Sequence, residues 1–386
     1  MTPAAPVRFP YAITGTHTTL GPVITMDAWA KRARVPHRRE PGRHLDGANI
    51  TRLLGVESKS WGPERFASLD TVADAARTAL DGAGVEADDV TAVITVTCTP
   101  YQIMLDQDAF TLMRTLGVPD HVLPLQLGAG CAGLARAAAL VAQLRAERAL
   151  VISYNVTSRI VGCGEDGALP PSYRDNSVHP FGKSVWASPA LFSDAAAAVV
   201  LERDEDVDGL LLYSRDSQSF DNGPGVSDPL IHFLGGGNDH PATRPGAAEL
   251  ACYGMNAPEI TRYYSRGMAL NHRALNDARP GYLDEVARLY THQANPTLVD
   301  AFIREAGLSD RKAPSNVRRL GNTVTPSTLA LLHADHLDGA LAFDDRACFS
   351  VVGSGPERGT FIAPIRIPAL PPRPAEVPGS RPARAV

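Results

Sequence analysis

Residues 128–155 have the sequence GAGCAGLARAAALVAQLRAERALVISYN, in which a cysteine between glycines is followed by two apolar runs. The first run, from Cys131 to about Arg148, is apolar on nearly every side of a helix, which predicts a helix buried on most of its faces. The second run, Ala149–Tyr154, is predicted to be a buried strand. A buried helix leading into a buried strand indicates an α/β protein.

The same alternation continues on both sides of this stretch. Upstream, the sequence predicts helices over Ser68–Ala83 and Asp108–Leu116 and strands over Ala92–Thr97 and Leu123–Leu127. Downstream, it predicts helices over 257–275, 298–306 and 326–333, a strand pair formed by 195–202 and 209–214, and a closing strand pair formed by 348–352 and 360–365.

The length of 386 residues exceeds what one small core needs, so we expect two halves. We assign residues 1–205 to the first half, with an insertion on the surface near 160–189, and residues 206–367 to the second. The proline-rich segment 368–386 is predicted to be a disordered tail. An enlarged loop at 219–246 and the 160–189 insertion form either a lid or acceptor pocket, or decoration without a function.

Composition excludes several classes of function. The net charge of −5 argues against binding nucleic acid. No stretch approaches the roughly 20 apolar residues of a membrane span, and the first ten residues lack the pattern of a signal peptide, so we expect a cytoplasmic protein. Five cysteines without a C-x-x-C pair predict neither a disulfide framework nor a zinc site, and we expect no metal and no bound cofactor.

Cys131 is the cysteine whose surroundings in the sequence favour a reactive thiol. It follows Gly128-Ala129-Gly130 and precedes the apolar helix, where free backbone N–H groups and the helix dipole favour a thiolate. Small neighbours let a thioester carbonyl approach the sulfur and a backbone N–H. The alternative is that Cys131 is an apolar core residue, which is the commoner role of a free cysteine.

A catalytic thiol needs partners that are distant in sequence and close in space. His292 lies in T-H-Q-A-N-P, where Asn295 can cap a helix that Pro296 opens. Asn322 lies in G-N-T before another helix opened by proline. Taken alone, each would more often be an ordinary loop or turn residue.

Together these segments resemble the active site of the ketoacyl-acyl carrier protein synthase III family. The resemblance rests on G-A-G-C-A-G at Cys131, H-Q-A-N at His292 and G-N-T at Asn322, in that order, and on further motifs at Phe192–Val200, Met255–Glu259 and Gly353–Gly355. The family's arginine-rich segment for docking coenzyme A corresponds to Gly55–Lys59 in this sequence.

The resemblance implies a thiolase fold, in which two similar halves form a five-layer αβαβα architecture, and a homodimer. It implies that Cys131 carries an acyl group delivered as a phosphopantetheine thioester by coenzyme A or acyl carrier protein. His292 and Asn322 would then bind the enolate oxygen of a malonyl unit, and the backbone N–H groups of Cys131 and Gly355 would hold the other oxyanion. Met104 and Leu105, with Asp106, would line the acyl pocket across the dimer.

We therefore expect decarboxylative C–C bond formation between a Cys-bound acyl group and a malonyl-type thioester, in a specialised polyketide- or fatty-acid-like pathway. The alternative within this fold is an acyltransferase that passes the acyl group to an alcohol or amine, with His292 as general base. A degenerate partner that binds acyl carriers without chemistry is disfavoured because all three catalytic residues are present.

Overall fold

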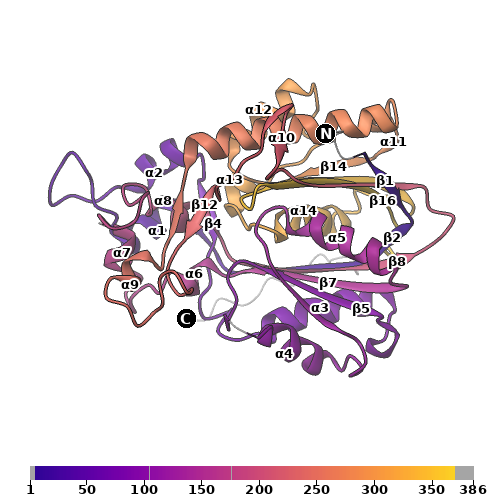
Figure 1. Cartoon of the computed structure of the whole chain (residues 1–386), viewed down its shortest axis with the longest axis horizontal. Helices are drawn as coiled ribbons and strands as arrows, with labels where there is room; N and C mark the ends of the chain where they lie inside the picture. The colour runs from indigo at the N-terminus through magenta and orange to yellow at the C-terminus, as the bar shows by residue number, and fades with distance from the viewer. Residues whose placement is uncertain (1–4, 104, 175, 370–386) are drawn as a thin grey trace, which may run out of the picture.

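The computed structural model of the chain describes residues 5–103, 105–174 and 176–369 (Figure 1). Two groups of strands face each other, with helices between them and on both outer faces. The two groups join where β16 and β2 pair through Ile365 and Ile13. The result is the five-layer α/β arrangement predicted from the sequence, and that prediction is confirmed.

The first sheet has the strand order β6-β5-β7-β8-β2. Strand β5 spans the predicted Ala92–Thr97, and all of its residues are buried, because helices cover both faces of the sheet. β5 is parallel to β6 and β7, whereas β8 is antiparallel to β7 and β2. The other strands are β2 (Tyr11–Leu20), β6 (Pro124–Gly128), β7 (Arg148–Asn155) and β8 (Ala195–Arg203).

The second sheet has the order β14-β15-β16-β9-β1. Its strands are β1 (Val7–Phe9), β9 (Gly209–Arg215), β14 (Arg288–Thr291), β15 (Asp345–Gly353) and β16 (Glu357–Ile365). The antiparallel pair of β15 and β16 confirms the predicted closing pair. The predicted pairing of β8 with β9 is wrong, because the short link between them crosses from one sheet to the other.

Two helices lie between the sheets, α5 (Gly133–Leu144) and α14 (Pro326–Leu337). α5 contacts strands of both sheets, which explains its nearly all-apolar surface. It begins at Gly133, where a Cβ atom would lie 2.4 Å from Val96 Cγ1. It ends before the predicted Arg148 because Arg145 takes a left-handed conformation, with φ of 53°.

The outer faces are covered by long amphipathic helices. α3 (Asp70–Ala83) and α4 (Gln107–Leu116) cover the first sheet, and α10 (Ala257–Ala278) and α12 (Pro296–Glu305) lie over the second. Asn295 caps α12 as predicted, since its side chain accepts the N–H of Leu298 at 3.0 Å. None of the described helices combines the length and apolar character that crossing a bilayer demands.

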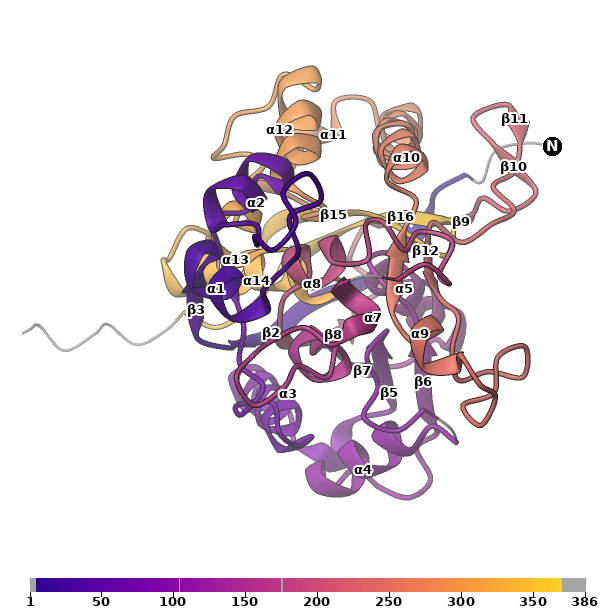
Figure 2. The ribbon, with the colours of Figure 1, turned by 90° about the vertical axis from the view of Figure 1, so that its left-hand side faces the viewer.

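Shorter elements extend the molecule at one end, the left side of Figure 1 and the near side of Figure 2. They are α1 (Met26–Ala33), α2 (Gly47–Leu54), α6 (Thr157–Ile160), α7 (Pro171–Arg174), α8 (Ala187–Leu191), α9 (Ala247–Leu250), β3 (Val23–Thr25), β4 (Ser58–Ser60), β12 (Ile231–Phe233) and β13 (Tyr253–Met255). Elsewhere lie the hairpin β10 (Ser219–Phe220) and β11 (Gly223–Pro224), the helices α11 (Tyr282–Glu285) and α13 (Val317–Leu320), and a 3₁₀ turn at Ala87–Asp89.

The 160–189 insertion is not a simple surface loop, which corrects the prediction. Tyr173 and Val185 are buried in a cluster with Met26 and other residues of α1, because the segment contributes apolar side chains to that core. Asn176 also donates to the Glu249 carbonyl at 2.6 Å, which fastens the insertion to α9. Of the predicted tail 368–386, residues 370–386 lie outside the described part of the chain.

Candidate active site

Cys131 lies between the end of β6 and the start of α5, and it is buried. The preceding residue is anchored because the Thr325 hydroxyl donates to the Gly130 carbonyl at 2.5 Å. At Gly353, a Cβ atom would lie 2.6 Å from the Ala132 backbone nitrogen, so glycine lets the end of β15 approach the cysteine segment. Close packing of both halves thus holds the thiol at their junction.

The protonation of Cys131 differs from the prediction of a stabilised thiolate. Burial raises the pKa of the thiol well above its usual range, and nearby Cys98 and Glu357 raise it further, whereas a hydrogen bond from Asn322 lowers it. Desolvation outweighs the helix N-terminus here, because a buried anion loses the hydration that it has in water. The thiol proton must therefore leave while the sulfur attacks.

His292 is a buried, neutral imidazole at the end of β14. Its backbone N–H donates to the Ser350 carbonyl at 2.9 Å, and its own carbonyl accepts the Tyr264 hydroxyl at 3.0 Å. Nδ1 lies 3.3 Å from the Ser327 hydroxyl oxygen at the start of α14. Burial lowers the pKa of His292 from 6.5 to about 3, so the ring is uncharged near neutral pH.

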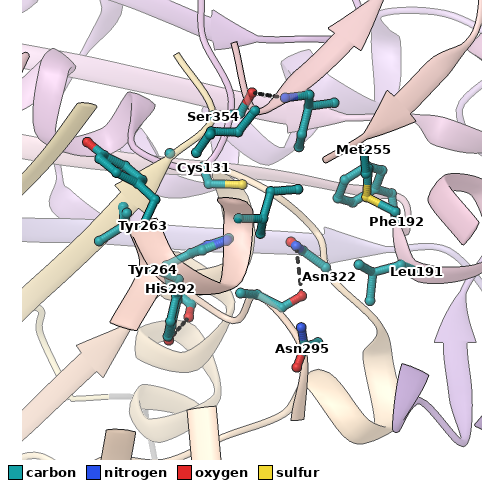
Figure 3. A pocket seen from close by; sticks show the side chains of 16 residues that line it. Cys131, Leu191, Phe192, Met255, Tyr263, Tyr264, His292, Asn295, Asn322 and Ser354 are labelled. Atoms are coloured by element: carbon teal, nitrogen blue, oxygen red, sulfur yellow. Dashed lines mark hydrogen bonds between the residues drawn. The ribbon is translucent and has the colours of Figure 1, made fainter. Parts of the chain in front are cut away.

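The Asn322 amide is held by two backbone contacts. Nδ2 donates to the Ala294 carbonyl at 3.1 Å (Figure 3), and Oδ1 accepts the Val324 N–H at 2.8 Å. These contacts fix which end of the amide carries hydrogen and leave the second Nδ2 hydrogen to the Cys131 thiol or to a ligand that replaces it. The turn that carries Asn322 is also tied to the first half, because Ser193 N–H donates to the Asn322 carbonyl at 2.9 Å.

Two cavities meet at Cys131. The smaller has a volume of about 60 Å³ and is lined by Cys131, His292 and Asn322 together with mainly apolar side chains (Figure 3). The larger, of about 230 Å³, shares Cys131 and is lined in addition by Arg136 and Glu357, among others. The structure thus brings the three predicted catalytic side chains together around one cavity, although 161 positions separate Cys131 from His292 (292 − 131).

The glycine loop Gly353–Gly355 borders both cavities. Ser354 fastens it to the 219–246 segment, since its carbonyl and its hydroxyl oxygen accept the N–H groups of Leu230 and Ile231, each at 3.1 Å. Within the described part of the chain, neither the Cys131 N–H nor the Gly355 N–H donates to a backbone carbonyl. Both groups therefore remain available for an oxyanion, and their predicted role stays a prediction.

The predicted pocket residues lie elsewhere in a single chain. Met104 falls outside the described residues. Leu105 is 79% exposed, and neither it nor Asp106 is among the described residues that line the two cavities. Because the prediction assigns these residues to a partner's pocket, a single chain leaves it a prediction.

Lys59, in the segment that corresponds to the family's coenzyme A docking motif, is fully buried. Its ammonium group donates to the carbonyls of Phe192 at 2.6 Å and Ala190 at 3.3 Å, and it lies 4.3 Å from the centroid of the Trp61 ring. Burial lowers the pKa of Lys59 to about 7. This side chain supports the core under α8 and does not face a ligand.

Sequence reasoning missed Tyr264 and Ser327, which hold His292, and the pair Arg136 and Glu357 in the larger cavity. Tyr264 and Ser327 carry no sequence signal that separates them from ordinary helix residues. Arg136 did have a signal, because it is a charged residue one turn into a helix that is otherwise apolar. Glu357, two residues after the glycine loop, could have been found in the same way.

Comparisons with known proteins identify the family of the chain. The family 3-oxoacyl-(acyl-carrier-protein (ACP)) synthase III C terminal matches residues 280–363, which contain His292 and Asn322. A protein from Streptomyces coelicolor named beta-ketoacyl-(acyl-carrier-protein) synthase III 3 is 30% identical over 348 residues, which cover 82% of this chain and 91% of that protein. A synthase III from Oleidesulfovibrio alaskensis is 28% identical over 293 residues, 74% of this chain and 81% of the relative.

Solved structures show the same fold. A 3-oxoacyl-(acyl carrier protein) synthase III from Pseudomonas aeruginosa superimposes with a TM-score of 0.70 at 21% identity, covering 94% of this chain and all of that one (100%). A variant of OleA from Xanthomonas campestris gives a TM-score of 0.72 at 16% identity, covering 92% and 99%. The chain has the thiolase fold of condensing enzymes. It belongs to the beta-ketoacyl-(acyl-carrier-protein) synthase III family.

Proposed function

We propose that the protein forms a C–C bond by decarboxylative condensation of an acyl group on Cys131 with a malonyl-type thioester. The observation that carries the proposal is the meeting of Cys131, a neutral His292 and the oriented Asn322 amide around one cavity. The family relationship supports the same reaction class, since the relatives are named as beta-ketoacyl-(acyl-carrier-protein) synthases.

The first half-reaction is acyl transfer to sulfur. Cys131 Sγ attacks the thioester carbonyl, the bond from that carbonyl to the pantetheine sulfur breaks, and the thiol proton passes to the departing pantetheine thiolate. The oxyanion of the tetrahedral intermediate lies between the N–H groups of Cys131 and Gly355. A raised thiol pKa suits this order of events, because the anion forms only while it reacts.

The second half-reaction uses the donors of the smaller cavity. As the malonyl unit loses carbon dioxide, negative charge moves onto its thioester oxygen, where His292 Nε2–H and Asn322 Nδ2–H donate to it. Acceptance of the Ser327 hydroxyl by Nδ1 would keep the proton on Nε2. The carbanion then attacks the acyl carbonyl on Cys131, the C–S bond breaks, and the thiolate takes up a proton.

The acyl donor is proposed to be a phosphopantetheine thioester of acyl carrier protein or coenzyme A. The cavity around His292 is lined mainly by apolar side chains such as Met255 and Ile260, which suits an uncharged arm. The 219–246 segment supports a specialised acyl substrate, because its Phe233 lines the larger cavity together with Tyr253 of β13, with the two ring centroids 4.8 Å apart. A specialised biosynthetic pathway is part of this proposal.

A homodimer is also proposed. β6 is the last strand of its sheet, and exposed apolar side chains lie on and beside it, namely Leu123 (68% exposed), Phe110 and Leu105. An open strand edge bordered by apolar surface favours pairing with a second copy. Light scattering would contradict this proposal if it gave the mass of one chain at working concentration.

The decisive experiment measures carbon dioxide release from malonyl-pantetheine by the protein and by His292→Ala, with acylation of Cys131 followed by intact mass. We expect release by the wild type to fall about 100- to 1000-fold in the variant, because a donor to the enolate is lost. If the wild type becomes acylated but releases no carbon dioxide, condensation is contradicted and acyl transfer to an alcohol or amine takes its place.

A further inference from the structure

We propose that the larger cavity selects a short acyl group that carries a neutral, hydrogen-bonding substituent, such as a hydroxyl or keto group, near its thioester end. Arg136, Glu357 and Tyr213 would be the specificity-determining residues. This inference rests on the proposed acylation of Cys131 and goes beyond it by naming the class of acyl group.

The larger cavity is the one suited to the acyl chain. Among the described residues, His292 and Asn322 line only the smaller cavity, where the malonyl oxygen would bind. Cys131 borders both, so an acyl group on its sulfur can extend into the other space. That space, at about 230 Å³, is also the roomier of the two.

The polar wall of this cavity is an ion pair between Arg136 on α5 and the buried Glu357 on β16. Arg136 Nε donates to Glu357 Oε2 at 2.8 Å and Nη2 donates to Oε1 at 2.6 Å, while the Tyr213 hydroxyl donates to Oε2 at 2.7 Å. The Glu357 side chain is only 2% exposed. A bidentate pair of this kind holds both groups in a fixed orientation.

The pair lies next to the predicted oxyanion site. A Cβ atom built at Gly355 would be 3.9 Å from Glu357 Oε1 and 4.0 Å from Arg136 Nη2. An acyl group whose carbonyl oxygen faces the Gly355 N–H would therefore bring its first few carbons near the guanidinium. The polar substituent is expected at those carbons, not at the end of a long chain.

A second network with the same chemistry shows what a purely structural arrangement looks like. Asp335 on α14 accepts Arg288 Nε and the Tyr290 hydroxyl, both at 2.8 Å. Arg288 also donates through Nη1 and Nη2 to the carbonyls of Ala287 and Ala340, each at 3.2 Å, and its side chain is 9% exposed. Three of the five guanidinium N–H groups of Arg288 thus donate to the protein, and burial keeps the other two from a ligand.

Arg136 donates from the same three nitrogens, but it differs from Arg288 in its exposure and in its position beside a cavity. Its side chain is 32% exposed, and its Nη1 reaches a carbonyl, that of Gly128, only at 3.4 Å. It lines a cavity, whereas none of the cavities described above includes Arg288 in its wall. Arg136 therefore keeps N–H groups for a ligand.

The charge balance sets the class of substituent. Glu357 already neutralises Arg136, so a carboxylate gains little attraction and must lose its hydration on entering. An alkyl group leaves the remaining guanidinium N–H groups without an acceptor, which is costly once water is displaced. A hydroxyl or keto oxygen accepts from Arg136 without adding charge.

The test compares three pantetheine thioesters of equal carbon number, butyryl, 3-hydroxybutyryl and succinyl, by their rates of acylating Cys131 at limiting concentration. We expect the 3-hydroxybutyryl thioester to react about tenfold faster than either of the others, the effect of one retained hydrogen bond. Equal or faster reaction of the butyryl thioester in the wild type would overturn the inference.

The triple variant Arg136→Met, Glu357→Leu and Tyr213→Phe removes the network without leaving a buried group unpaired. We expect its preference to shift to the butyryl thioester. The matched control, Arg288→Met, Asp335→Leu and Tyr290→Phe, should keep the wild-type ratio. Because each ratio compares the acylation rates of different thioesters on the same protein, differences in stability between the variants cancel.

The outcomes separate the two proposals. An unchanged ratio in the Arg136 variant would overturn the specificity role, even if Cys131 is acylated normally. Failure of all three thioesters to acylate the wild type would instead contradict the proposed function, and the inference with it.

Discussion

The two cavities that meet at Cys131 are built in different ways. The smaller is mainly apolar, and the polar atoms of its His292 and Asn322 side chains are held by single contacts to Ser327 and to the backbone. The larger carries a charged pair in which both partners are fixed by each other. This difference indicates that the side chains of the smaller cavity stabilise charge that develops only during the reaction, whereas the larger cavity contains charged side chains at all times.

The first prediction separates the two cysteines that border the larger cavity. Cys131→Ala should lose acylation completely, because no other group can form the thioester. Cys98→Ser should keep it, since Cys98 is not among the described residues that line the smaller cavity with His292 and Asn322, and its thiol donates to the Asn155 amide oxygen at 3.4 Å. Intact-mass measurement after incubation with an acyl thioester checks both, and a label on Cys98 in the wild type would contradict the assignment.

The second prediction concerns the smaller cavity alone. Asn322→Ala should lower carbon dioxide release from a malonyl thioester by about 100-fold, the usual cost of removing one oxyanion donor. Acylation of Cys131 should fall much less, because the acyl oxyanion is assigned to backbone N–H groups. The two rates are measured on the same preparation, and equal losses in both would show that the division between the cavities is wrong.

The third prediction uses two glycines of the loop shared by both cavities. Gly353→Ala should destabilise the fold by about 1–3 kcal/mol, because the new Cβ would lie 2.6 Å from Ala132 N and 2.8 Å from Ala132 Cβ. Gly355→Ala is the control, since its nearest atoms would be 3.9 Å away. Urea unfolding checks the pair, and equal midpoints would mean that the loop does not press on the Cys131 segment.

The smallest expected effect is that of pH on the smaller cavity. Burial lowers the pKa of His292 from 6.5 to about 3, so the active neutral form persists as the pH falls through 6.5. Decarboxylation by Cys131→Ala protein, which removes the thiol titration, should therefore show no inflection near pH 6.5. An inflection there that His292→Ala abolishes would contradict the buried, uncharged ring.

The same shift affects stability with a defined sign. In the unfolded chain His292 binds a proton below about pH 6.5, whereas the folded protein excludes that proton down to about pH 3. The unfolded state is therefore favoured as the pH falls across this window. The urea concentration at the midpoint of unfolding, measured across this pH window, should decrease as the pH falls.

Much of the architecture could be predicted from local pattern. β5 lies over the predicted residues, and α3 and α4 begin and end within two residues of their predicted bounds, because periodicity and glycine stops are properties of neighbouring residues. The Asn295 cap was predictable for the same reason. The pairing of β8 was not, because partner choice between sheets depends on packing of the whole chain.

The α/β alternation and the family could be predicted from the sequence alone, and Cys131, His292 and Asn322 could be proposed from it as catalytic residues, because each rests on local spacing and short motifs. The tertiary structure was needed to see that burial raises the pKa of the Cys131 thiol, which keeps it protonated, and lowers the pKa of His292, which keeps it neutral. Desolvation depends on every group packed around a site. It was also needed to see that Arg136 forms an ion pair with Glu357 near Cys131. Residues 221 positions apart become partners only when α5 packs on β16, which close approach at Gly359 permits.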